Sequence, residues 1–227
     1  MKIEKIVIFV TELTKFLTKK MIIFMKTTFK TCLVAIALLI GVNTYAQDKP
    51  ITFGVKAGVN LSNISGEGES GDAKIGFKAG VSLDYALSQD LYLMTGLNYS
   101  LQGSKIGEVD GKSVKLDLSY LQLPVHIGYK LNVAEGAKLV FHGGPYVGYA
   151  VDGKWKYAGE SLNAFGDIAK EGIAKLKRFD AGLGIGAGVE FGQFGVDLGW
   201  DFGLTKINDG SGSIKNRNGY LTVGYKF

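Results

Sequence analysis

From residue 53 to residue 227, apolar residues alternate with polar residues or glycine, and this period of two constrains the fold more than any other feature. Successive side chains of a β-strand point to opposite sides, so a period of two indicates a strand with one apolar face. The pattern recurs in eight runs: residues 53–62, 74–88, 91–102, 114–130, 139–151, 179–191, 194–204 and 219–227. The chain is therefore predicted to be all-β.

The fourth run changes phase along its length. Its first apolar residues, from Val114 to Tyr120, share one parity, whereas Leu121 to Tyr129 share the other. A β-bulge places one extra residue in a strand and would reconcile the two halves. We therefore expect a bulge near residues 120–124, where Pro124 is tolerated.

Alternation alone also fits a soluble sandwich or a lipocalin-like barrel, but the position of the aromatic residues favours a membrane barrel. The strand middles hold Ala, Val, Leu and Ile, whereas aromatic side chains of the apolar faces lie at strand ends, as in two interfacial girdles. These aromatic residues are Phe53, Tyr85, Tyr99, Tyr129, Tyr149, Phe179, Phe191, Phe194, Tyr225 and Phe227. The opposite faces are too polar for a dry core. We therefore expect the apolar faces to contact lipid and the polar faces to line the interior.

The connections between the runs alternate in length. Residues 63–73, 103–113, 152–178 and 205–218 form long polar stretches, and residues 88–90, 131–137 and 192–193 form short ones. Outer-membrane barrels show this asymmetry between their two ends. The prediction is an eight-stranded antiparallel up-and-down transmembrane β-barrel with short periplasmic turns and longer extracellular loops, located in the cell outer membrane.

Charged residues on the inward faces form the main polar constellation. They are Lys56, Lys78, Asp84, Asp180, Glu190, Asp197, Asp201 and Lys226. Both signs occur among them, three lysines and five carboxylates, and charges removed from water must be paired. We expect a lumen salt-bridge network that fills the narrow interior of an eight-stranded barrel, with inward glycines leaving room for long side chains. The alternative is a selectivity lining for a small pore.

The N-terminal region has the features of an export signal. Residues 33–42 are apolar, two lysines precede them, and Ala46 followed by Gln47 forms a cleavage point. We divide the chain into a misassigned start or disordered extension (1–24), a signal peptide (25–46), a short periplasmic N-terminus (47–52) and a barrel domain (53–227). Cys32 precedes the apolar run, which is the wrong side for lipid attachment.

The net charge of +5 does not indicate a nucleic-acid partner. Seven of the 26 basic residues but only two of the 21 acidic residues lie in residues 1–46, so the remainder is electrically balanced. No polyanion-binding surface follows from the overall charge.

The sequence does not favour an enzyme or a cofactor site. Ser119 and His126 lie on one strand about 23 Å apart, and no Gly-x-Ser-x-Gly nucleophile motif stands on a strand-to-helix turn. Asp117 and His142 complete the set of possible catalytic groups. We assign no catalytic, cofactor or metal residues and expect both histidines to lie in the lumen or at an interface.

The stretch 152–178 interleaves the aromatic residues Trp155, Tyr157 and Phe165 with lysines. Such a surface can bind a glycan, a lipopolysaccharide phosphate or an envelope protein. The alternative is a solvated loop without a ligand. Apolar residues near helical spacing also allow a short helix within 163–177.

Several motifs, taken in order, resemble a known family. They are Tyr45-Ala46-Gln47, residues 54–60, 120–124, 143–147 and 179–189, and Tyr225-Lys226-Phe227. Together they resemble the PorT-type outer-membrane β-barrel proteins of Bacteroidetes-like bacteria. The terminal Val223, Tyr225 and Phe227 resemble the aromatic signature that barrel assembly machinery reads.

The resemblance and the residues together lead to three candidate functions. We expect a non-enzymatic envelope structural or surface-interaction protein, surrounded by outer-membrane lipid and lipopolysaccharide. The alternatives are an accessory component of an envelope secretion or transport system, which the resemblance implies, and a small porin-like channel.

Overall fold

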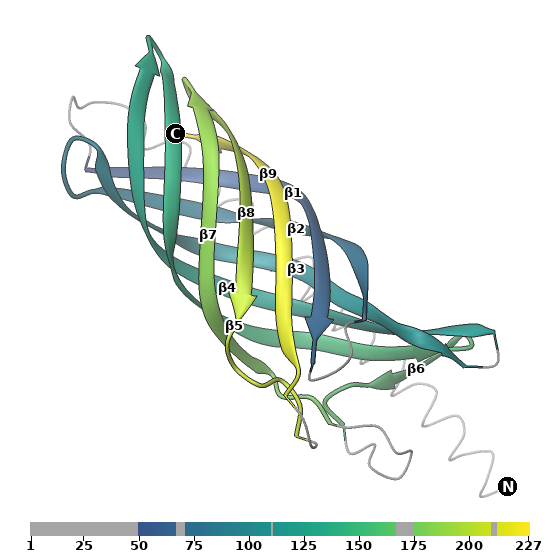
Figure 1. The fold of residues 1–227 in the computed structure, drawn as a ribbon. Coiled ribbons are helices and arrows are strands. Elements are labelled where there is room, and N and C mark those ends of the chain that lie inside the picture. The colour runs from purple at the N-terminus through teal and green to yellow at the C-terminus, as the bar shows by residue number, and fades with distance from the viewer. Residues whose placement is uncertain (1–49, 67–70, 110, 167–174, 210–212) are drawn as a thin grey trace, which may run out of the picture. The chain divides into compact units, whose positions relative to one another are not determined.

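The computed structural model describes residues 50–66, 71–109, 111–166, 175–209 and 213–227, and residues 48–227 form one compact unit. The elements of this unit are strands (Figure 1). They are β1 (Ile51–Ser65), β2 (Asp72–Ala86), β3 (Leu91–Val109), β4 (Lys112–Ala134), β5 (Ala137–Tyr157), β6 (Glu160–Asn163), β7 (Phe179–Phe191), β8 (Phe194–Gly203) and β9 (Lys215–Lys226). Among the described residues, no helix has the length and hydropathy needed to cross a bilayer.

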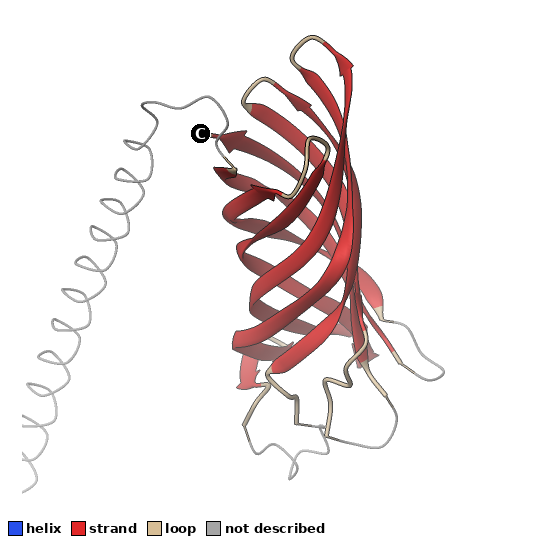
Figure 2. Cartoon of the chain, turned by 90° about the vertical axis from the view of Figure 1, so that its left-hand side faces the viewer, coloured by secondary structure: helices blue, strands red, loops and turns tan. Residues whose placement is uncertain are grey.

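Eight of these strands close into a ring. The sheet runs in the order β4-β3-β2-β1-β9-β8-β7-β5, and a further pairing of β4 with β5 closes it. Each pairing is antiparallel, and β1 pairs with β9 to join the two ends of the barrel sequence. The short strand β6 lies outside the ring and pairs with the end of β5. The strands wind obliquely around the barrel (Figure 2). The predicted eight-stranded antiparallel barrel is confirmed.

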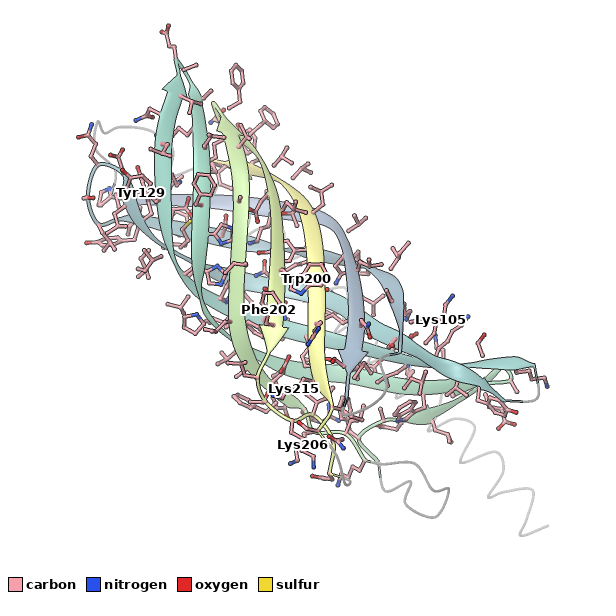
Figure 3. The ribbon with its side chains drawn as sticks, viewed as in Figure 1. Lys105, Tyr129, Trp200, Phe202, Lys206 and Lys215 are labelled. Carbon is pink, nitrogen blue, oxygen red and sulfur yellow. The ribbon has the colours of Figure 1, made fainter. Side chains whose placement is uncertain are left out.

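The two faces of the wall are as predicted. The apolar parity is exposed on the outside, as at Leu123, Ile185 and Leu198, while polar residues such as Asn98 and Gln122 are buried inside. Figure 3 shows the labelled aromatic residues Tyr129, Trp200 and Phe202 along this wall. The outward aliphatic side chains have no protein core to pack against, so they form the lipid-facing surface.

The short turns lie at one end of the barrel. Gly136 (φ 73°) joins β4 to β5 and Gly192 (φ 56°) joins β7 to β8. A left-handed backbone conformation is costly for residues with a Cβ, which explains glycine at both turns. By the usual asymmetry, this is the periplasmic end.

The opposite end differs from the prediction in how far the strands extend. The stretch 103–113 was expected to be a loop, but β3 and β4 continue through it as a hairpin. Similarly, β5 continues to Tyr157, and β6 occupies part of the predicted loop 152–178. The helix considered within 163–177 lies in part outside the described residues. β1 begins at Ile51, two residues before the expected start of the barrel.

The predicted bulge lies on a different strand. β4 keeps one register with β3 from Lys115 to Tyr129, so no extra residue stands near 120–124. Instead, Ser119 pairs with Asp152 while Tyr120 pairs with Ala150, which leaves Val151 as the extra residue on β5. The phase change in β4 has another cause: apolar residues of its outer end point inward and form a buried cluster.

Candidate functional site

An ionic cluster occupies the periplasmic half of the lumen. Lys130 Nζ lies 2.7 Å from Asp84 Oδ2 and 3.2 Å from Glu190 Oε1. Lys226 Nζ contacts the same two carboxylates. The ammonium group of Lys130 also lies 4.3 Å from the centre of the Tyr92 ring. Two cations and two anions from β4, β9, β2 and β7 thus neutralise one another across the barrel.

A second ion pair crosses the middle of the lumen. Lys78 Nζ donates to Asp201 Oδ2 at 3.0 Å, and both side chains are buried. The same ammonium group lies 3.8 Å from the centre of the Tyr220 ring, and Asn218 donates to Asp201 at 3.4 Å. The charge of Lys78 is therefore paired with a carboxylate and an aromatic face.

Two histidines form a stacked pair beside this ion pair. His126 Nδ1 lies 2.8 Å from His142 Nδ1, and the ring centres are 5.1 Å apart. His142 Nε2 lies 3.0 Å from Asp197 Oδ1. Glycine makes room for both rings, because a Cβ at Gly184 or Gly186 would lie 2.8 Å or 2.4 Å from a ring atom.

In the described part of the chain, the hydrogen-bond partners of the two histidines are each other and Asp197. Among the described residues, no serine, threonine or cysteine side chain is hydrogen-bonded to His126 or His142. A catalytic nucleophile is activated by a base within hydrogen-bond reach, often at a looser distance when no substrate is bound. Within the same part of the chain, no group of three His, Cys, Asp or Glu side chains is arranged to hold a metal ion.

A buried carboxylate stands in the outer half of the lumen. Asp180 accepts hydrogen bonds from Tyr146 Oη at 3.2 Å, Asn216 Nδ2 at 3.0 Å and Thr205 Oγ1 at 2.9 Å. Asn216 also donates to Tyr120 Oη at 3.1 Å. These hydrogen bonds connect β7 to β5, to β9 and to the segment after β8, so Asp180 links three parts of the barrel.

The outer mouth is closed by a hydrophobic cluster, which we call the outer plug. It consists of the buried residues Ile64, Leu116, Leu118, Tyr120, Ala150, Ala164, Leu176 and Ile207, with Trp155, Phe165 and Ile214 packed against them. Backbone hydrogen bonds join the loop segments over the mouth, including Leu176 N to Ala164 O at 3.0 Å and Lys177 N to Ile207 O at 2.8 Å. The described segments of two outer loops therefore pack onto the inward apolar residues of β4.

Two spaces lie along the lumen, and the larger, of about 290 Å³, is bordered by Tyr92, Lys130 and Lys226 at the periplasmic end. A cavity of about 100 Å³ lies between the ionic cluster and the histidine pair, and Lys56, Thr222 and Met94 are among the residues that line it. A space of this size holds only a few water molecules. Between this cavity and the outer end, the described side chains of the central ion pair, the Asp180 hydrogen bonds and the outer plug occupy the lumen.

The predicted lumen residues fall into separate groups. Asp84, Glu190 and Lys226 belong to the ionic cluster, Lys78 and Asp201 form the central pair, and Asp197 contacts His142. Lys56 lines the cavity, and Asp180 has neutral partners. Sequence reasoning missed Lys130 as a member of the network, although it alternates with the lipid-facing Tyr129 and Leu131.

The other predicted residues are placed as follows. Trp155 and Phe165 pack against the outer plug, and Arg178 lies 4.1 Å from the centre of the Phe165 ring. Tyr157 is exposed.

At the opposite end, Val223 is exposed on β9, and the rings of Tyr225 and Phe227 meet edge to face at 5.4 Å. Ala46 and Gln47 lie outside the described residues.

Comparisons with known proteins give a family and several structural neighbours. A family model described as outer membrane protein beta-barrel domain matches residues 45–209. Similar solved structures include Neisserial surface protein A, with 16% identity, a TM-score of 0.48 and coverage of 79% of this chain and 100% of that one. OprG from Pseudomonas aeruginosa has 15% identity, a TM-score of 0.45 and coverage of 79% and 97%.

A further neighbour is Ail of Yersinia pestis in complex with the heparin analogue sucrose octasulfate. It has 18% identity, a TM-score of 0.44 and coverage of 79% of this chain and 100% of that one. No curated protein matches the sequence.

Proposed function

This chain belongs to the family of outer membrane protein beta-barrel domains and is located in the cell outer membrane, and from that premise we propose that it is a non-enzymatic envelope structural or surface-interaction protein. One observation carries the proposal. The outer mouth is closed by the outer plug, while the hairpin of β3 and β4, the end of β5 and β6 carry exposed side chains. Such a molecule offers a binding surface to the outside.

The contents of the lumen support a closed barrel over a small channel. Opposite charges are paired at Lys130–Asp84 and Lys78–Asp201, whereas a selective pore presents one sign of charge to its solute. Eight strands enclose a space that side chains can fill. The absence of a hydroxyl or thiol hydrogen-bonded to the described histidines supports a role without catalysis.

The first experiment measures the conductance of the purified barrel in a planar bilayer. We expect no steady openings, because the outer plug and the ionic cluster both block the path. Steady openings on the order of a nanosiemens, as in aqueous porin channels, would overturn the closed-barrel proposal.

The second experiment identifies what the outer face contacts. A photo-cross-linking residue at the exposed Tyr157 is compared with the same residue at Phe141, which lies on the lipid-facing wall. The surface-interaction role is supported if Tyr157 alone cross-links to a glycan or a host ligand. It is also supported if no protein partner is captured. One stoichiometric envelope protein at Tyr157 would instead support the accessory role in secretion or transport that the PorT resemblance suggests.

A further inference from the structure

The bulge on β5 decides which way its outer end faces. On the periplasmic side of the bulge, the side chain of Tyr149 points outward and is exposed. Because Val151 is an extra residue, Asp152, Lys154 and Lys156 then take the outward face, opposite Ser119, Asp117 and Lys115 of β4. Without the bulge, both lysines would point toward the mouth. Bulges of this kind re-aim side chains at barrel rims.

The re-aimed Lys156 completes a row of three lysines on adjacent strands. Lys105 of β3 pairs directly with Lys115 of β4, and Lys115 pairs directly with Lys156 of β5. Directly paired residues point to the same side of a sheet with Cβ atoms about 5 Å apart. We call Lys105, Lys115 and Lys156 the cationic row; Lys105 lies toward the same end of the barrel as Lys206 and Lys215 (Figure 3).

Like charges in directly opposed positions destabilise a sheet, so the cationic row is costly unless an anion neutralises it. Lys156 Nζ lies 2.8 Å from Asp117 Oδ2, a carboxylate that it shares with Lys74. Lys105 and Lys115 are exposed, and neither forms an ion pair within the described part of the chain. The carboxylate of Asp72 on β2 lies directly opposite Lys105 on the side away from Lys115, so Lys115 is the member of the row without a carboxylate beside it, and both exposed ammonium groups can reach an external anion.

The position of the cationic row relative to the lipid-facing wall indicates which anions can reach it. On β4, Lys115 shares its outward parity with the exposed, lipid-facing residues Leu121 and Leu123. It lies six residues beyond Leu121 toward the outer end, which is roughly 20 Å along an extended strand and less along the normal of a tilted one. The row therefore continues the outward face of the lipid-facing wall, on the outer side of the level at which Leu121 pairs with the girdle residues Tyr99 and Tyr149.

We propose that the cationic row binds phosphate groups of lipopolysaccharide in the outer leaflet around the barrel. Lysine ammonium groups bind phosphate as point charges and need no fixed orientation of the lipid. The inference deepens the proposed surface role and rests on it for the orientation of the barrel. It does not depend on a protein partner.

The test compares two charge-matched variants in zwitterionic detergent. The double variant Lys105→Gln/Lys115→Gln removes the two unpaired members of the row. The control Lys175→Gln/Lys215→Gln removes two lysines from other outer segments. Binding of fluorescently labelled lipopolysaccharide is measured for each protein, and heat-modifiable migration on gels verifies that each barrel is folded.

We expect the double variant to bind lipopolysaccharide about tenfold or more weakly, given the contribution of each basic residue near an anionic surface. The control and Lys105→Arg/Lys115→Arg should stay within roughly twofold of the wild type, since in both the row keeps its charge. Dephosphorylated lipopolysaccharide should bind the wild type as weakly as intact lipopolysaccharide binds the double variant.

Equal binding by the wild type and the double variant would overturn the proposal, as would an equal loss in the control. Inositol hexakisphosphate serves as a soluble polyanion. If it bound the row as tightly as lipopolysaccharide, the site would be one for soluble polyanions and the lipid assignment would be wrong. A barrel that bound lipopolysaccharide normally but conducted ions would contradict only the closed-barrel function.

Discussion

Lys78 and Asp201 form an ion pair, with Nζ 3.0 Å from Oδ2, across the lumen between strands that are not neighbours in the ring. Lys78 belongs to β2 and Asp201 to β8, and β1 and β9 lie between them. The pair therefore joins the N-terminal and C-terminal parts of the barrel on either side of the seam where β1 meets β9. Each of the two buried charges therefore has its partner on the other side of this seam.

The first prediction concerns the loss of one partner. Asp201→Leu leaves the buried charge of Lys78 unpaired, and we expect it to lower the free energy of unfolding by about 3–5 kcal/mol. The double variant Lys78→Met/Asp201→Leu should recover most of this loss, because no uncompensated charge remains. Urea-induced unfolding in lipid vesicles measures both values.

An exposed ion pair provides the control. Lys177 and Asp209 lie 3.4 Å apart with both side chains about half exposed, so Lys177→Gln should cost less than about 1 kcal/mol. If Asp201→Leu were no more harmful than Lys177→Gln, the buried charge of Lys78 would not depend on Asp201 for compensation.

The sequence predicts the membrane-embedded wall well because lipid on one side and a polar lumen on the other force a strict alternation. Phe179 to Phe191 shows this, since each exposed apolar residue is followed by glycine or an inward polar residue. Above the bilayer both faces of a strand meet water, and the alternation is lost. Residues 103–109 and 152–157 therefore resemble loops in sequence although they continue β3 and β5.

The candidate site was predicted less completely, because pairing partners depend on register. The inward parity identifies Lys78 and Asp201 but does not show that they meet. The outer plug was missed because the inward Leu116 and Leu118 have the same composition as lipid-facing residues. Likewise, no local sequence feature indicates a bulge at Val151, because its position depends on how the whole lengths of β4 and β5 pair.

The second prediction concerns close packing at the seam. A Cβ at Gly58 of β1 would lie 2.0 Å from the backbone oxygen of Leu221 on β9. Gly58→Ala therefore forces the two strands apart, and we expect a loss of about 1–3 kcal/mol in the free energy of unfolding. Unfolding in vesicles measures this loss.

Gly195→Ala is the matched control for the seam variant. A Cβ at Gly195 would meet its nearest atoms at 3.7 Å, which is ordinary contact, so its effect should stay within roughly 0.5 kcal/mol. Equal effects of the two alanine variants would contradict the role assigned to Gly58.

The third prediction concerns the aromatic residues of the last strand. We expect Phe227→Ala to reduce assembly into the outer membrane while changing the stability of the folded barrel by only about 1 kcal/mol, the value of an aromatic pair. The comparison is Phe191→Ala, which removes a lipid-facing aromatic side chain that is 68% exposed. Fractionation of cells measures assembly, and normal assembly of Phe227→Ala would show that this residue is not part of a recognition signature.

The fourth prediction tests the outer plug. Ile207 is fully buried, its backbone nitrogen donates to Ile214 and its oxygen accepts from Lys177. Ile207→Asp places a charge in an apolar cluster, which is unfavourable enough to release the segment rather than keep it packed. We expect trypsin added from outside to cleave near residues 175–206 about tenfold faster or more, because cleavage follows the population of the opened state.

The membrane-embedded wall should remain intact in that variant, since its strands do not depend on the packing of Ile207. Leu162→Asp on β6 is the matched control, because it makes the same chemical change at a side chain that is already 37% exposed. Its cleavage rate should equal that of the wild type. If Ile207→Asp were cleaved no faster than Leu162→Asp, the loop segments would not be held by the outer plug, and the closed mouth on which the proposed function rests would lose its support.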